Sequence, residues 1–259
     1  MALARILGFA GGAIVDGVQV LVTSASFARE RTISYMTMLD VPPTNDSRSR
    51  VAFADGVHVV TGNTSFDLTS QFMPKLTTSE FLRRLHQFDV TIHDGINDYT
   101  LEDCYWTSLS LSGAPDGLIS TNLGFIARNN WSPGGPAISF VRNRVPYGYW
   151  YSGNEDVREW SLSLNQDVSP VYSNEDTVWP RYLRVGLWDA TLEVTTYDQL
   201  QAHDTVVIAT SSFTITGNTA SDGYNFGGQS DLGTYTHSFQ SGTVIDGGLS
   251  SAIDIISVV

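Results

Sequence analysis

Two hexapeptides of the same pattern, SLSLSG at residues 108–113 and SFTITG at 212–217, constrain the fold more than any other feature of the chain. Each alternates a small polar residue with an apolar one and ends on glycine, which is typical of a β-strand with one buried face. In the first hexapeptide, Leu109 and Leu111 then share a face. The pair indicates that the chain contains the same module twice.

Three further pairs of similar segments lie upstream, in the same order in both halves. They are RVAF at 50–53 with RVPY at 144–147, TSFDLTSQF at 64–72 with EWSLSLNQDV at 159–168, and QFDVTIHDG at 87–95 with WDATLEVTTYD at 188–198. The offset between partners grows steadily along the chain, as duplication followed by loop insertions would produce. We therefore predict two tandem modules, residues 1–133 and 134–259, joined at the turn-rich segment NNWSPGGP.

The aligned strands predict equivalent core positions in the two modules. These are Phe66, Leu68, Val90 and Ile92, matched by Leu162, Leu164, Leu192 and Val194. Each module is expected to carry a short helix in a loop. In the first, Thr77 and Glu80 form a capping box before an apolar helix face, and in the second, Pro180 should shorten or distort the helix.

Composition agrees with an all-β fold, because Thr, Ser, Val, Gly and Tyr are plentiful and runs of Ala, Leu, Glu and Lys are absent. The apolar segment near residues 6–15 is too short to span a membrane, so we expect an N-terminal arm. Residues 29–50 begin like a strand and end in a polar tip, which is typical of an excursion from a small barrel.

Acidic residues outnumber basic ones, 27 to 14, and give a net charge of −13. Lys75 is the only lysine, and no cation follows Arg184. Nucleic-acid binding needs clustered cations, so specific binding of DNA or RNA is excluded, whereas a surface that repels nucleic acid is possible. Acidity that only maintains solubility is the simpler alternative.

Enzymatic, metal and cofactor sites are not predicted. Adjacent carboxylates in a strand face opposite ways, so neither Glu102–Asp103 nor Glu155–Asp156 can flank a substrate alone. The five histidines lack a third ligand at metal spacing. The loop at 222–231 resembles a calcium loop but has no bidentate Glu. The single cysteine, Cys104, is expected to be a small buried side chain.

Tyr147, Tyr149, Trp150 and Tyr151 form an aromatic cluster that could stack on sugars. A carbohydrate-binding β-sandwich is therefore one alternative function. Packing between modules or subunits is the other interpretation of this cluster.

SLSLNQDVSPVY followed by WPRYLRVGLWDATLEVTT resembles the tail tube proteins of long-tailed bacteriophages. The residues that carry the resemblance are Leu162, Leu164, Asn165, Asp167, Arg184, Gly186, Leu192 and Val194, together with the late strand pair at 106–128. The resemblance covers about 50–128 and 144–240, at the level of pattern. It implies tandem tube-like β-barrel or β-sandwich modules without catalytic residues.

The resemblance implies a major tail tube subunit in the virion, assembled in the host cytoplasm and joined to other tail proteins. Rings stack into a tube through which double-stranded DNA passes without specific binding. If a ring needs six modules, three chains close a pseudo-sixfold ring, and six chains with twelve modules are the alternative. A tail-tip distal or hub protein, also built from tube modules, is the first functional alternative, and the carbohydrate-binding module is the second.

An acidic inner wall would repel the passing DNA. The candidate channel-lining residues lie on two strands that the repeat treats as equivalent. They are Asp89, Asp94, Asp189, Glu193 and Asp198.

Overall fold

The structure is a computed structural model that describes residues 12–36, 52–77, 86–94, 96–114, 117–135, 157–173, 178–197, 205–208, 211–215, 217–225, 233–241 and 253–254. Its strands are β1 Gly12–Val15, β2 Val18–Met36, β3 Ala52–Asp67, β4 Phe88–His93, β5 Asp98–Gly113, β6 Ser120–Ala127, β7 Ser132–Pro133, β8 Val157–Val171, β9 Tyr182–Thr196, β10 Thr205–Ile208, β11 Ser211–Ile215, β12 Gly217–Asn225, β13 Thr234–Ser241 and β14 Ile253–Asp254. Helix α1 spans Met73–Thr77. The described residues are mostly β-strand, so the all-β prediction is confirmed.

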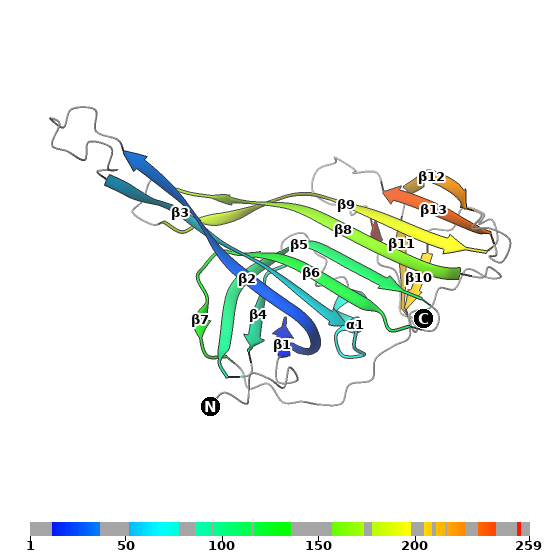
Figure 1. The fold of residues 1–259 in the computed structure, drawn as a ribbon, viewed down its shortest axis with the longest axis horizontal. Coiled ribbons are helices and arrows are strands. Elements are labelled where there is room, and N and C mark those ends of the chain that lie inside the picture. Colours follow the sequence, from blue (N-terminus) through cyan, green and yellow to red (C-terminus); the bar gives the residue numbers. More distant parts are fainter. Residues whose placement is uncertain are drawn as a thin grey trace, which may run out of the picture.

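The first half of the chain forms a closed antiparallel barrel of six strands. Neighbours run β5–β4–β1–β2–β3–β6, and β6 returns to β5 to complete the circle. β6 accompanies β3 only from Val60 onward, so β2 and the first part of β3 continue beyond the barrel as a two-stranded arm (Figure 1). The excursion expected at 29–50 therefore begins as this arm, and residues 37–51 lie outside the described residues.

A two-residue turn joins β1 to β2. Asp16 and Gly17 both have positive φ, at 50° and 75°, which is the geometry that tight hairpin turns with the right twist require. The Asp16 carboxylate also forms an ion pair with Lys75 of α1, with Oδ2 and Nζ 2.8 Å apart. The only lysine of the chain thus ties the helix to the first hairpin.

The barrel is filled by alternate residues of its strands. Its largest fully buried side chains include Trp106, Phe66 and Phe125. Phe125 lies opposite both Trp106 on β5 and Gly62 on β3. A Cβ on Gly62 would collide with the Phe125 ring, so the missing side chain of Gly62 makes the space that this ring occupies.

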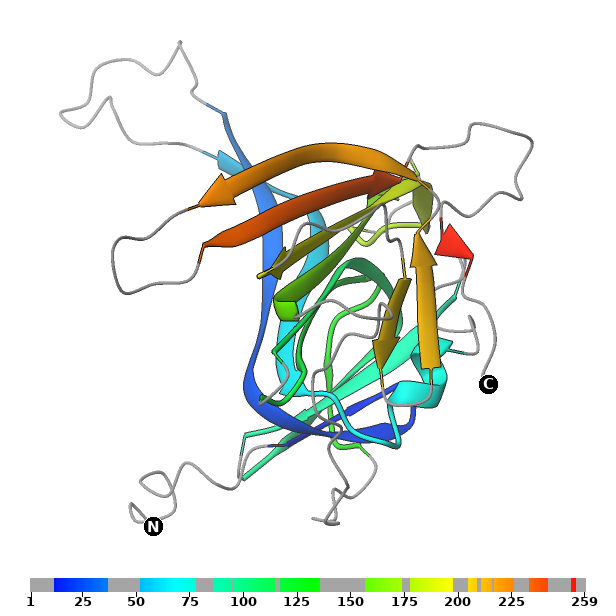
Figure 2. The ribbon, with the colours of Figure 1, turned by 90° about the vertical axis from the view of Figure 1, so that its right-hand side faces the viewer.

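The sheet does not end at the barrel. Ser108–Gly113 of β5 pairs with Asn165–Trp160 of β8, and the sheet continues through β9 and β13 to β12. β10, β11 and β14 form a separate sheet, in which β11 contacts both β13 and α1. Figure 2 shows this small sheet beside the β12–β13 hairpin.

All eight predicted core residues are buried, with at most 8% exposure. The strands that carry them nevertheless have different neighbours. β3 pairs with β2 and β6, and β4 with β1 and β5, whereas β8 and β9 pair directly with each other. The aligned segments therefore agree in which face is buried but differ in their place in the sheet.

The predicted helices fare differently from the core. Residues 78–85 lie outside the described residues, and the short helix α1 ends at Thr77, before that segment. The prediction of a helix around Pro180 was wrong for the described residues 178–186. Residues 178–181 are irregular, and β9 begins at Tyr182. Since proline has no N–H to donate, its place before a strand is compatible with this start.

The predicted linker at 129–136 is partly attached to the barrel. Ser132 and Pro133 pair with Thr100 and Tyr99 of β5, and the Trp131 ring packs 4.8 Å from that of Phe27. The N-terminal arm at residues 1–11 lies outside the described residues.

Replacing Gly62 by alanine should destabilise the barrel by about 1–3 kcal/mol, because the new methyl group overpacks the Phe125 ring. Chemical denaturation of Gly62→Ala measures this cost. Gly223→Ala is the matched control, since a Cβ there meets only the Thr236 carbonyl oxygen at 4.0 Å. Equal stability of the two variants would contradict the packing argument.

Candidate channel-facing surface

The extended sheet has one apolar and one polar face where β3, β6, β5, β8, β9 and β13 lie side by side. Leu109 and Leu111 are buried, as are Leu162 and Leu164 opposite them on β8. The residues between them in sequence project from the other face. The alternation in SLSLSG thus separates a core face from a polar face.

Strand register arranges the residues of this polar face in three rows that cross the sheet. The rows are Asn63, Gly124, Ser108, Asn165 and Asp189; Ser65, Asn122, Ser110, Ser163 and Thr191; and Asp67, Ser120, Ser112, Ser161, Glu193 and Ser238. We call these residues the polar face. Apart from that of Glu193, its side chains are short, and none is Lys, Arg or aromatic.

The polar face is accessible and bears only negative charge. Glu193, Asn122 and Asn165 are exposed, and Asp189 is half-buried. Ser65 Oγ donates to Asn122 Oδ1 across two strands, at 3.4 Å. Hydroxyl and amide groups bind water readily, while the carboxylates repel other anions. Such a surface can stay hydrated next to a polyanion without holding it.

Two of the five predicted channel residues, Asp189 and Glu193, lie together on this face, on β9. Asp198 lies outside the described residues. Sequence reasoning missed the rows of serine and threonine, although the polar residues of SLSLSG and SLSLN belong to them. Their common face became evident only when the strand register aligned these residues across neighbouring strands.

Asp89 lies elsewhere, exposed on β4 of the barrel. Its Oδ1 accepts a hydrogen bond from the backbone N–H of Asp103, at 3.3 Å. Asp103 has a φ of 54°, a conformation that is unfavourable for a residue with a Cβ. Asp89 therefore supports a strained backbone position in β5.

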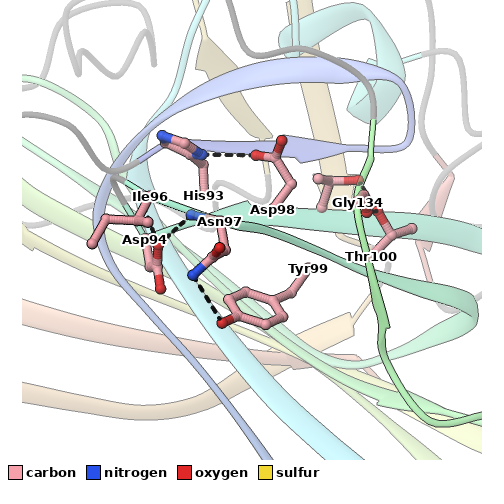
Figure 3. Close-up of polar contacts among 9 residues, drawn as sticks. His93, Asp94, Ile96, Asn97, Asp98, Tyr99, Thr100 and Gly134 are labelled. Atoms are coloured by element: carbon pink, nitrogen blue, oxygen red, sulfur yellow. Dashed lines mark hydrogen bonds and ion pairs between the residues drawn. The ribbon is translucent and has the colours of Figure 1, made fainter.

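Asp94 begins the turn between β4 and β5 (Figure 3). Its Oδ1 accepts the backbone N–H groups of Asn97, at 2.7 Å, and Ile96, at 2.9 Å. These two hydrogen bonds hold the pKa of the Asp94 carboxyl below its usual value. On the neighbouring strand ends, His93 Nδ1 lies 2.7 Å from Asp98 Oδ1. The geometry assigns Asp94 to shaping this turn.

The groups considered for chemistry are scattered. Burial raises the pKa of the Cys104 thiol, so the thiol remains protonated, and its prediction as a buried side chain is confirmed. Among the described residues, no three His, Cys, Asp or Glu side chains come close enough to hold a metal ion. Over the same part of the chain, no helix is long and apolar enough to cross a membrane.

Three further expectations fall partly or wholly outside the described residues. The carboxylate pair Glu155–Asp156 and the aromatic cluster at 145–153 lie wholly outside them. Of the possible calcium loop at 222–231, residues 226–231 lie outside them. Glu102 and Asp103 both lie on β5, and neither belongs to a group of metal-ligating side chains among the described residues.

Comparison with protein-family models and with curated proteins gave no match for this chain.

Replacing Asp94 by alanine should lower the melting temperature at neutral pH, because the turn loses both hydrogen bonds. The lowered pKa means that this contribution is fully present above the usual value of 3.8 and is lost as pH falls through the folded-state pKa. The difference from wild type should therefore shrink below pH 3.8. Asp94→Asn keeps an acceptor oxygen and should recover stability without this pH dependence. A difference that persists unchanged in acid would contradict the role of the carboxylate.

Proposed function

We propose that the chain is a structural subunit of a bacteriophage tail tube, with two tube-like modules that form stacked rings around a DNA channel. The observation that carries the proposal is the continuous sheet with its polar face. The sheet crosses from the barrel into the second half through β5 and β8. On the polar face, short hydroxyl and amide side chains surround Asp67, Asp189 and Glu193. We assign this face to the channel wall.

The physical argument rests on what the polar face lacks. A protein that grips DNA presents Lys or Arg to the phosphates, and each contact strengthens binding. Solvent-facing sheets also commonly carry long charged side chains of both signs. Apart from Glu193, the polar face has short side chains, and its charged groups are all negative, which suits a wall along which DNA slides.

The open edge of the sheet supports assembly. β12 ends the strand order, and within the described residues no strand covers its outer side. Its sequence, GNTASDGYN, contains no Lys or Pro, the residues that commonly protect an edge from pairing. Pairing with another copy at unlike edges produces rings. Three chains would supply the six modules of a ring in the virion, and the assembled rings would contact other tail proteins.

The tail-tip distal or hub role remains the first alternative, because the same modules would serve it. The carbohydrate-binding alternative depended on residues 145–153, so no described contact favours it. The structural role involves no catalytic residue and no cofactor.

Electron microscopy of the purified chain tests the assembly. We expect long hollow tubes, and an isolated ring should have about three times the chain mass of 28.3 kDa. Single rings that never stack would favour the tail-tip alternative. A discrete monomer retained on a polysaccharide would favour carbohydrate binding and overturn the proposal.

A charge reversal tests the assignment of the wall. Tubes of Glu193→Lys should retain short duplex DNA at low salt, because each copy adds a cation to the channel, and retention should fall steeply as salt rises. Glu102→Lys is the matched control, since Glu102 is also exposed but lies outside the polar face. Co-sedimentation of DNA with the tubes measures the effect. Equal retention by both variants would place the polar face away from the channel.

A further inference from the structure

Two runs of four neighbouring strands in the sheet follow the same plan. The first run is β2–β3–β6–β5, and the second is β8–β9–β13–β12. Each run begins with a long hairpin, β2–β3 or β8–β9 (Figure 1). Each ends with a second hairpin, β5–β6 or β12–β13, whose first strand lies at the end of the run. By position in the sheet, β8 therefore corresponds to β2 and β12 to β5, whereas the sequence similarities matched β8 with β3.

Interruptions of the strand register extend this correspondence to single residues. The β2–β3 and β8–β9 hairpins are each interrupted twice. The interruptions lie at Val22/Ser24 and Arg31/Ile33 on β2, and at Val157/Glu159 and Gln166/Val168 on β8. Both positions on β8 follow those on β2 by 135 residues, from 22 to 157 and from 31 to 166. The residues opposite them, on β3 and β9, differ by 130 in both cases, from 66 to 196 and from 58 to 188. The two hairpins therefore align over their length.

The second hairpins align in the same way. Each is interrupted once, at Trp106/Ser108 on β5 and at Thr219/Ser221 on β12. These positions differ by 113 residues, from 106 to 219 and from 108 to 221. The residues opposite them, Phe125 on β6 and Phe239 on β13, differ by 114.

The pairing between the hairpins checks these offsets. Thr61 of β3 lies opposite Ile126 of β6. The offsets of 130 and 114 carry this pair to Thr191 of β9 and Gln240 of β13, which do lie opposite each other. The two four-stranded units therefore match in strand order, in direction and in register.

One unit joins the other through β5 and β8. This junction contains six residue pairs, from Ser108 opposite Asn165 to Gly113 opposite Trp160. The strands at the two far ends, β2 and β12, each have an open edge. β1 pairs with β2 only at Val18–Val20, and in the described part of the chain no strand lies beside the rest of that edge or outside β12. An open edge presents unpaired backbone N–H and C=O groups to a partner.

We propose that the open edge of β12 pairs with the open edge of β2 in a second copy of the chain, so that the β5–β8 junction is repeated between copies. The directions agree, because neighbouring strands of both units are antiparallel and β12 and β2 correspond to β5 and β8. Applied to Ser108 and Asn165, the offsets of 113 and 135 set Ser221 of one copy opposite Glu30 of the next. This inference rests on the ring assembly proposed above and names its edges, but it does not depend on the passage of DNA.

Two aromatic side chains at these edges fit the joint. In the β5–β8 junction, Leu111 lies opposite Leu162, and both are buried. Their counterparts are Tyr224 on β12 and Phe27 on β2. The Tyr224 side chain is 59% exposed, although its ring packs 4.7 Å from that of Tyr235, and Phe27 is half-buried. The joint would bury both rings against each other, and such cross-strand aromatic pairs stabilise a sheet.

The adjacent pair of counterparts carries opposite charges. Leu109 and Leu164 of the internal junction correspond to Asp222 on β12 and Arg29 on β2. Opposite charges on directly facing residues attract each other across a strand pair. A slip of one residue would set Asp222 opposite Glu30, and facing residues of like charge repel. The charges therefore favour the register that the offsets predict.

The polar face continues across the same joint. On β2, Ser26 lies opposite Asn63, and on β12, Ser221 lies opposite Ser238. Asn63 and Ser238 both belong to the polar face. Because residues two apart in a strand share a face, a joint in this register extends the rows of the polar face from one copy to the next. The β5–β8 junction extends them in the same way within the chain.

Disulfide cross-linking of the whole chain tests the joint. The offsets set Gly223 of one copy opposite Ala28 of the next, as Ser110 lies opposite Ser163. Ala28 is exposed, and a Cβ on Gly223 meets only the Thr236 carbonyl oxygen at 4.0 Å, so both positions accept cysteine. Oxidation of a chain carrying Gly223→Cys and Ala28→Cys should link copies into a ladder of covalent oligomers on non-reducing electrophoresis, because facing Cα atoms of antiparallel strands lie within disulfide reach.

The control carries Gly223→Cys and Ser24→Cys. Ser24 is exposed on the same strand, but it lies roughly 13 Å from position 28 along β2, which is beyond the reach of a disulfide. This variant should remain a single chain on the same gel. The native Cys104 is buried and is present in both variants, so it does not account for a difference between them.

A charge exchange tests the register. Arg29→Asp alone and Asp222→Arg alone should each weaken association of the copies by roughly tenfold, because each sets like charges opposite each other. The double variant should restore association, which sedimentation velocity measures. A double variant that associates no better than the single ones would overturn the register.

The outcomes separate this inference from the proposed function. Linked copies that never stack into tubes would support the joint and contradict the tail tube. Tubes in which Gly223→Cys and Ala28→Cys do not link would overturn the joint and leave the tube in place. A disulfide within one chain, or equal linkage in the control, would also overturn the joint. A chain that forms no oligomer at all would overturn both.

Discussion

The shared use of β5 is the constraint on which the rest of the structure depends. On one edge, β5 pairs with β6 and so closes the barrel, and on the other it pairs first with β4 and then with β8. A single strand therefore satisfies backbone groups both of the closed barrel and of the extension of the same sheet into the second half. The irregularity between Trp106 and Ser108 lies where the partner changes from β4 to β8. The positive φ of Asp103 belongs to a second irregularity, in the β4–β5 pairing opposite Asp89.

The same strand divides polar from apolar surface across both halves. Leu109 and Leu111 lie buried opposite Leu164 and Leu162 of the second half. Ser108, Ser110 and Ser112 lie in the middle of rows that run from β3 and β6 onto β8 and β9. Strict alternation over this length allows one core and one hydrated surface to cross the junction without interruption. The alternation of polar and apolar residues therefore provides both the proposed channel wall and the buried contacts that join the two halves of the chain.

Sequence reasoning succeeded where a local period determines the outcome. Alternation identifies which residues are buried, so Phe66, Val90, Leu162 and Leu192 were all found. It does not identify the neighbouring strand, because that depends on contacts between residues far apart in sequence. For that reason the repeat aligned β3 with β8 but did not reveal that one belongs to a closed barrel and the other to a hairpin. Asp89 was assigned by charge, whereas its hydrogen bond to the Asp103 backbone depends on a bend that no local pattern shows.

Closure of the barrel also has a consequence for the order of folding. All of its strand pairs are formed by residues 12–127, so the barrel has its full set of partners before β8 leaves the ribosome. During that interval the edge of β5 at residues 108–113 is without its partner, and an unpaired edge attracts other chains. The arrival of β8 therefore does more than extend the sheet, since it also ends the period in which the nascent chain is most prone to aggregate.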